Sequence, residues 1–260
     1  MQKKEPEPEL EPEPEPELAQ KELDTLTSAG ARTALPSMRW IPTVPMGFRT
    51  LHGWRKPAAL LLGPTGAGKS SFGKHAEAHG FCGRECDHFD FGEQLRSVVR
   101  QQTPPTGAAV ALSSQQQATV RDVLERGALF TDDDTPMIRT ILRNFMAQRG
   151  LVNNQRSVLL LNGLPRHSGQ TALVADSIDI RWVVNLRLSS EDVAAVRTSG
   201  RHERADDTSD LVAKKLRVFR DRTLPLLEHY AAIGATIIPV TVDADTQPVD
   251  IQLAVENALR

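Results

Sequence analysis

Cysteine is scarce in this sequence, which has only Cys82 and Cys86 among its 260 residues. Two cysteines are too few for a disulfide framework, and such usage is typical of a reducing compartment. No apolar run approaches the roughly 18 residues that a membrane-spanning helix needs, and the N-terminus lacks the apolar core of a signal peptide. We therefore expect a cytoplasmic protein that does not enter a membrane.

A long basic run of the kind that binds nucleic acid is also missing. The formal net charge is −2, and the acidic excess lies at the N-terminus, where residues 5–18 repeat Glu-Pro and Glu-Leu. Alternate prolines and mutually repelling glutamates favour an extended arm over a packed structure. We predict a disordered arm over residues 1–37 and one folded domain over residues 38–260.

One stretch matches a chemical motif without a mismatch. Residues 63–70 read GPTGAGKS, which is the phosphate-loop pattern G-x-x-x-x-G-K-[ST]. The apolar residues 58–62 before it predict a strand buried on both faces. Residues 71–79 after it contain no proline and predict a helix that ends at Gly80. Strand, glycine loop and helix together are the context that the motif requires.

The chemistry of this loop follows from its residue types. Glycines let consecutive backbone N–H groups turn toward a phosphate, and the helix N-terminus adds partial positive charge. Lys69 is expected to reach the β- and γ-phosphates, and the Ser70 hydroxyl to ligate Mg²⁺. The loop therefore predicts a site for ATP and Mg²⁺.

The rest of the folded domain alternates strands with helices. Further strands are predicted at residues 86–91, 157–161, 181–188 and 235–242. Helices are predicted at residues 92–101, 114–127, 135–148, 189–197, 207–230 with a kink at Pro225, and 251–259. This alternation predicts an α/β fold, with a five-stranded parallel sheet covered by helices on both faces and the ligand at the carboxyl ends of the strands.

Five further motifs follow the phosphate loop in a characteristic order. Residues 91–96 (FGEQLR) resemble T-G-D-x-x-R, and residues 127–132 (GALFTD) resemble G-x-L-V-x-D. Residues 161–166 (LNGLPR) with Gln170 resemble L-D-G-F-P-R-x-x-x-Q. Segments RADD and TLPL, which begin at Arg204 and Thr223, resemble R-x-D-D and T-x-P-L. Over about residues 57–260 the chain thus resembles the nucleoside monophosphate kinases of the adenylate kinase family.

The resemblance implies a P-loop NTPase fold, a three-layer α/β/α sandwich. It places a small helical insertion for the acceptor at about residues 92–150 and a short lid at about residues 197–204. It also implies a reversible transfer of the γ-phosphoryl group of Mg-ATP to a nucleoside monophosphate, with AMP as the default acceptor. The implied protein is a monomer that binds ATP and the monophosphate.

Particular residues take roles from the resemblance. Arg96 and Arg166 would grip the acceptor phosphate, and Gln170 would hydrogen-bond its base. Arg197, Arg201 and Arg204 would close over the donor phosphates. The residues expected to bind ATP are Gly63, Pro64, Thr65, Gly66, Ala67, Gly68, Lys69, Ser70, Ser71 and Arg197. Those expected to bind the acceptor are Phe91, Gly92, Arg96, Phe130, Gly163, Arg166 and Gln170. Those expected to act in the transfer are Lys69, Arg96, Arg166, Arg201, Arg204 and Lys215.

Three positions depart from the family pattern. Asn162 stands where the family has an aspartate that orients water around Mg²⁺, so we expect Asn162→Asp to raise turnover. Asp90, just upstream of the acceptor segment, is the candidate to substitute for the missing carboxylate. Phe91 replaces a threonine near the acceptor base, and Lys215 replaces an arginine. These departures leave two alternatives open: a nucleotide-binding regulatory protein with weakened catalysis, and a kinase for another small acceptor.

A second cluster of metal-binding residue types lies after the phosphate loop. His75, His79, Cys82, Cys86 and His88 occur within fourteen residues. Their spacing matches no standard zinc pattern. A buried cysteine and surface histidines are the favoured interpretation.

Overall fold

The structure is a computed structural model that describes residues 55–100, 110–151, 154, 156–199 and 209–260. Several predictions fall outside these residues. They are the N-terminal arm, the start of the domain near residue 38, and the side chains of Arg201 and Arg204 in the expected lid.

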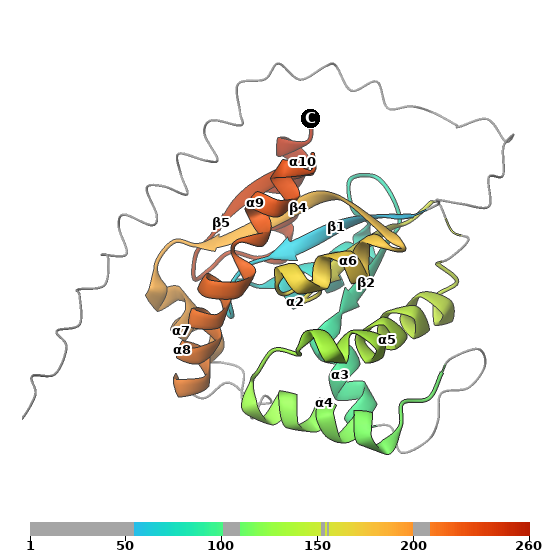
Figure 1. Cartoon of the computed structure of the whole chain (residues 1–260). Helices are drawn as coiled ribbons and strands as arrows, with labels where there is room; N and C mark the ends of the chain where they lie inside the picture. The colour runs from blue at the N-terminus through green and yellow to red at the C-terminus, as the bar shows by residue number, and fades with distance from the viewer. Residues whose placement is uncertain (1–54, 101–109, 152–153, 155, 200–208) are drawn as a thin grey trace, which may run out of the picture. The chain divides into compact units, whose positions relative to one another are not determined.

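A five-stranded sheet forms the centre of the domain (Figure 1). Its strands are β1 (Lys56–Leu62), β2 (Cys86–Asp90), β3 (Val158–Asn162), β4 (Ile178–Leu188) and β5 (Thr236–Val242). Their order is β2-β3-β1-β4-β5, and each neighbouring pair is parallel. The predicted parallel sheet is confirmed. β1 lies in the middle and all seven of its residues are buried, as its continuous apolar run predicts.

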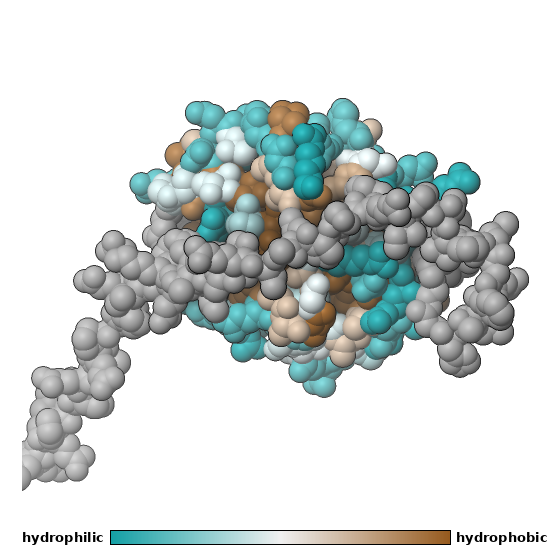
Figure 2. Space-filling view, turned by 90° about the horizontal axis from the view of Figure 1, so that it is seen from above, coloured by the Kyte–Doolittle hydropathy of each residue, from teal (hydrophilic) through white to brown (hydrophobic). Residues whose placement is uncertain are grey.

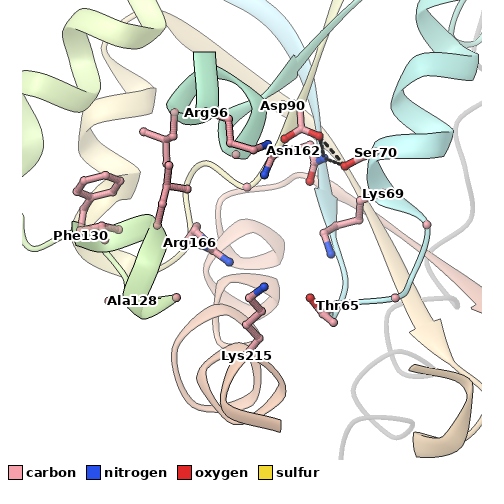
Figure 3. A pocket seen from close by; sticks show the side chains of 18 residues that line it. Thr65, Lys69, Ser70, Asp90, Arg96, Ala128, Phe130, Asn162, Arg166 and Lys215 are labelled. Atoms are coloured by element: carbon pink, nitrogen blue, oxygen red, sulfur yellow. Dashed lines mark hydrogen bonds between the residues drawn. The ribbon is translucent and has the colours of Figure 1, made fainter. Parts of the chain in front are cut away.

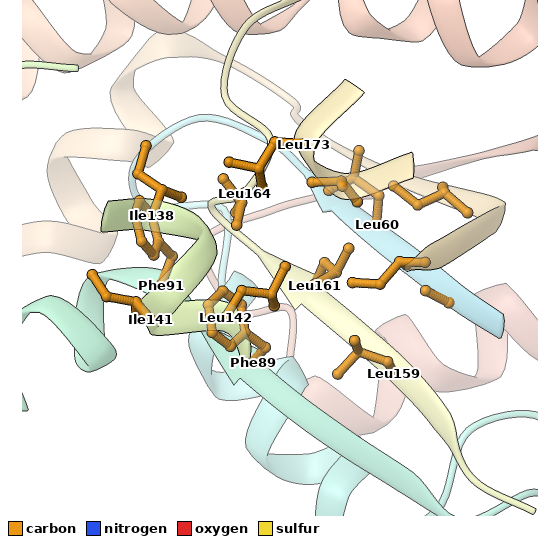
Figure 4. Packing of buried hydrophobic residues seen from close by; sticks show 14 of the residues in the cluster. Leu60, Phe89, Phe91, Ile138, Ile141, Leu142, Leu159, Leu161, Leu164 and Leu173 are labelled. Carbon is orange, nitrogen blue, oxygen red and sulfur yellow. The ribbon is translucent and has the colours of Figure 1, made fainter. Parts of the chain in front are cut away.

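Helices cover both faces of the sheet, and successive residues of β1 show why. Leu60 packs in one apolar cluster with α5 (Thr135–Gln148), α6 (Thr171–Ala175) and α9 (Leu226–Ala232) (Figure 4). Leu61 packs in a second cluster with α2 (Lys69–His79) and α10 (Pro248–Ala258). Alternate strand residues point to opposite faces, so one strand contributes to both clusters. The three-layer α/β/α architecture is confirmed.

Two predicted helices have the bounds that the sequence indicated. In α5 the apolar positions with helical spacing are all buried: Met137, Ile138, Ile141, Leu142, Phe145 and Met146. The helix α4 (Ser114–Arg126) begins after Ser113, whose side chain accepts a hydrogen bond from the Gln116 amide, and ends at Gly127 with φ +58°. A serine N-cap and a left-handed glycine are the standard start and stop signals of a helix.

The segment predicted as one kinked helix over 207–230 is divided. It comprises α8 (Ser209–Val218), a π-helical turn η4 (Phe219–Thr223) and α9. The amide of Leu224 donates to the carbonyl of Phe219 at 2.9 Å, five residues back. Pro225 has no N–H to continue a regular ladder, and a π-helical turn accommodates the irregularity. The sequence therefore predicted an irregularity near Pro225 correctly, but the irregularity is a π-helical turn and not a kink within one helix.

The remaining elements are short. They are α3 (Phe91–Arg100), η2 (Asp132–Asp134), η3 (Ser168–Gln170) and α7 (Glu191–Ser199). None of the helices in the described ranges is long and apolar enough to span a bilayer. On the face shown in Figure 2, hydrophilic residues surround smaller apolar patches.

Candidate active site

The phosphate loop joins the carboxyl end of β1 to the start of α2. Gly66 and Gly68 have φ of +85° and +83°, a left-handed conformation that side chains with a Cβ rarely adopt. The Nζ of Lys69 donates to the carbonyls of Gly63 and Pro64 at 2.6 Å each. The lysine ammonium thus folds back over its own loop. An anionic phosphate oxygen would be a stronger partner for it than either carbonyl.

Ser70, Asp90 and Asn162 meet beside the loop (Figure 3). The Ser70 hydroxyl donates to Oδ2 of Asp90 at 2.5 Å. The Nδ2 of Asn162 donates to the same Oδ2 at 3.0 Å and to Ser70 Oγ at 3.2 Å. Asp90 and Asn162 are direct neighbours in the β2–β3 ladder, so the end of the sheet brings them together.

The Asp90 carboxylate is held in its ionised form. Burial raises its pKa, but hydrogen bonds from the Ser70 hydroxyl and the Glu93 amide lower it, as do the charges of His88 and Arg96, and the net shift is downward. A carboxylate and a hydroxyl are hard oxygen ligands of the kind that Mg²⁺ prefers. Ser70 and Asp90 therefore fit the metal that the phosphate loop requires.

A cavity of about 170 Å³ lies between the phosphate loop and the helices α3 and α4. Its basic residues are Lys69, Arg96, Arg166 and Lys215, and among the described residues Asp90 is the one carboxylate in its wall. Figure 3 shows Lys69, Arg166 and Lys215 pointing into the same space. The apolar part of the wall is formed by Leu95, Val123, Leu124, Ala128 and Phe130. The cavity therefore combines a cationic end with an apolar end.

Arg96 lies on α3 and is half-buried at the edge of the cavity. Its Nε donates to Oε2 of Glu93 at 3.1 Å, and Arg100 pairs with the other oxygen of the same carboxylate. The sequence interpretation did not include Glu93. Its spacing of three residues from Arg96 within one helix is a signal that would have identified the pair.

The main chain of Arg166 is fixed on both sides. Its amide donates to Oε1 of Gln170 at 2.9 Å, and its carbonyl accepts from the Thr223 hydroxyl at 2.7 Å. Burial lowers the pKa of the guanidinium, while the Asp90 charge raises it. Thr223 belongs to the π-helical turn, whose irregular backbone no sequence period indicated.

Two residues expected at the acceptor base lie elsewhere. Gln170 is only 1% exposed and is not part of the cavity wall; it supports the backbone of Arg166 instead. Phe91 is 2% exposed and packs against Phe89 and Phe130, with ring centroids 6.0 and 5.8 Å apart. A large apolar side chain at this position enters the core because burial of its surface is favourable. Gly92, Phe130 and Gly163 do line the cavity.

Arg197 contacts the phosphate loop but is not part of the cavity wall, so it does not close over the cavity as expected. Its Nε donates to the carbonyl of Gly66 at 2.9 Å. Its Nη1 donates to the carbonyls of Asp243, Ala244 and Thr246 at 2.8, 3.0 and 2.9 Å. The guanidinium thus ties the loop to the connection between β5 and α10. Its five N–H donors suit such convergence on carbonyls.

The histidines and cysteines after the loop do not come together. Within the described ranges no three of the His, Cys, Asp and Glu side chains are placed to hold a metal ion. The rings of His75 and His79 stack at 4.2 Å. His88 is 7% exposed, so the expectation of a surface histidine was wrong there. Its place on β2 directs it toward α2.

No family model matches the chain. Curated relatives do match it over most of its length. An adenylate kinase from Synechococcus sp. (strain WH7803) is 32% identical over 78% of this chain and 99% of its own. One from Parvibaculum lavamentivorans is 30% identical over 67% of this chain and 80% of its own. Among solved structures, a gluconokinase from Sinorhizobium meliloti 1021 is 20% identical with a TM-score of 0.42, covering 80% of this chain and 93% of its own.

Proposed function

The chain belongs to the adenylate kinase family of phosphotransferases, and from this premise we propose that it transfers the γ-phosphoryl group of Mg-ATP to a nucleoside monophosphate. AMP is the first acceptor to test. The transfer is reversible, since both sides of the reaction carry the same kinds of phosphate bonds.

The observation that carries this proposal is the shared cavity. The phosphate loop and the two arginines, Arg96 and Arg166, open onto one space of about 170 Å³. Phosphoryl transfer needs little covalent help from a protein, because its main demands are alignment of two anions and neutralisation of their charge. A single cavity with phosphate-binding groups on both sides meets both demands.

Each side of the cavity has its own task in the proposal. On the donor side, backbone amides and Lys69 bind the β- and γ-phosphates. On the acceptor side, Arg96 and Arg166 bind the phosphate with planar guanidinium groups, which suit bidentate contacts. Lys215 also lines the cavity and adds a positive charge, but its ammonium group cannot make the bidentate contact of a guanidinium. The apolar wall near Phe130 contacts the base.

Magnesium would be held by Ser70 and Asp90. When bound, the ion neutralises charge on the β- and γ-oxygens. The residues of this chain align the phosphates and exclude water around them. Because Asp90 supplies a carboxylate next to Ser70, Asn162 does not by itself argue for a protein with weakened catalysis.

A kinase for another small acceptor remains the second candidate. It is favoured by the positions of Gln170 and Phe91, which are buried away from the cavity and leave the base-contacting end without either side chain. An acceptor whose distal part is apolar or planar, with a phosphate or hydroxyl at the near end, would also fit this wall.

A transfer assay with Mg-ATP and a panel of acceptors tests the proposal. AMP, GMP, CMP and UMP are compared with non-nucleotide hydroxy acids and sugars. We expect transfer to at least one monophosphate. The variant Lys69→Met should abolish it, while Lys74→Met, an exposed change on the same helix, should not. Transfer to none of the monophosphates, in a protein that binds ATP, would overturn the proposal.

A further inference from the structure

The carboxyl ends of β2 and β3 present an acid and an amide side by side. Asp90 is the last residue of β2, and its partner in the parallel ladder is Asn162, the last residue of β3. Asn162 is 4% exposed, and Asp90 is half-buried in the cavity wall. Their side chains therefore interact where little water competes.

Both carboxylate oxygens of Asp90 accept hydrogen bonds from neighbouring residues. Oδ2 of Asp90 accepts from the Ser70 hydroxyl and from the Asn162 amide, and Oδ1 accepts from the Glu93 backbone amide at 3.1 Å. The amide of Asn162 also donates to Ser70 Oγ. One amide thus orients both of the oxygen groups that fit a magnesium ion.

We propose that Asn162 is a positioning residue whose amide orients the Asp90 carboxylate toward Ser70, so that β2 supplies the negative charge of the metal site and β3 supplies the donor. This inference rests on the proposed function for its metal, but the pairing itself concerns only residues of this chain. It reverses the expectation that Asn162→Asp raises turnover.

The reversal follows from the 3.0 Å contact between Nδ2 and Oδ2. An aspartate at position 162 has no N–H to donate, and its carboxylate would face that of Asp90. Two carboxylates at this distance repel each other, and Oδ2 of Asp90 would lose a hydrogen-bond donor. The change should therefore lower both the stability of the folded protein and its affinity for the metal.

The test compares the wild type with Asp90→Asn, Asn162→Asp and the exchange variant that carries both changes. The first measurement is the thermal unfolding midpoint at neutral pH without metal. The second is Mn²⁺ affinity, measured by electron paramagnetic resonance in the presence of a non-hydrolysable ATP analogue. Asn185→Asp is the matched control, because it places a carboxylate at a buried asparagine of β4 that is 1% exposed.

We expect Asn162→Asp to lower the unfolding midpoint, and the added Asp90→Asn change to restore most of that loss. The same second change should not rescue Asn185→Asp. Asp90→Asn alone should weaken Mn²⁺ binding about 10- to 100-fold, and the exchange variant should recover part of that loss.

The pairing is overturned if the exchange variant keeps the lowered unfolding midpoint of Asn162→Asp, or if Asn162→Asp binds Mn²⁺ at least as tightly as the wild type with no loss of stability. The metal role is overturned if Asp90→Asn leaves Mn²⁺ affinity unchanged, or if the wild type takes up no Mn²⁺ with the analogue. A wild type that binds both but transfers no phosphoryl group refutes the proposed function and leaves the pairing intact.

Discussion

Helix α2 lies against β2 through a contact that has no room for one more methyl group. A Cβ placed on Gly73 would come within 2.1 Å of Nε2 of His88 and within 2.3 Å of its Cε1. Both residues are buried. Because α2 carries Lys69 and Ser70 at its start, this packing also determines where the phosphate loop sits against the sheet.

The magnitude of a Gly73→Ala change comes from two opposing effects. Alanine in a helix interior is favoured over glycine by about 1 kcal/mol. Overpacking a buried contact costs about 1–3 kcal/mol. We therefore expect Gly73→Ala to lower the free energy of unfolding by about 1 kcal/mol, the balance of these two ranges. In a His88→Ala background the obstacle is gone, and the same change should raise it by about 1 kcal/mol.

Urea denaturation of the four proteins in this double-mutant cycle measures the prediction. The coupling between Gly73 and His88 should be about 2 kcal/mol, with a change of sign between the two backgrounds. If Gly73→Ala instead raised stability equally in both, the imidazole would not press on the helix, and the packing argument for the position of the loop would fail.

Three further predictions concern single contacts of the site. Thr223→Val removes the hydroxyl that donates to the Arg166 carbonyl; it should cost about 1–2 kcal/mol and raise the acceptor KM, whereas Thr223→Ser should retain both properties. Glu93→Gln removes the exposed ion pair between Glu93 and Arg96, which is worth at most about 1 kcal/mol. The acceptor KM at low salt should therefore fall by up to about fivefold, and it should not rise at any salt concentration tested. Burial raises the pKa of the Cys86 thiol to about 12, so its thiolate is scarce at pH 8. Labelling of Cys86 by a thiol reagent, followed by peptide mapping, should be on the order of 100-fold slower or more in the native protein than in urea. Equal rates would contradict its burial.

Much of the fold followed from local patterns. The apolar spacing of residues 135–148 predicted a helix, and the six large apolar residues that carry this spacing are buried. The run before Gly63 predicted a strand buried on both faces, and all seven residues of β1 are buried. These predictions succeed because a helix or strand forms where it can bury a continuous apolar face, and the spacing of apolar residues in the sequence shows that face directly.

The finer geometry of the site depends on contacts between distant segments. Asp90 and Asn162 become neighbours only through the register of β2 with β3, which no local pattern specifies. Gln170 turns to the Arg166 amide instead of the cavity. Both contacts form because buried polar groups need hydrogen-bond partners in the folded chain. The identity of those partners depends on distant segments and cannot be inferred from local sequence patterns.

The central claim is that two phosphate-binding groups of residues align a donor and an acceptor in one cavity. It is tested most directly by following the label of ATP carrying ³²P in its γ-phosphoryl group, incubated with Mg²⁺, AMP and the purified protein. We expect the label to appear in ADP formed from AMP, and Lys69→Met to prevent this. Label that appears only as free phosphate, or that stays in ATP with every monophosphate offered, would contradict it.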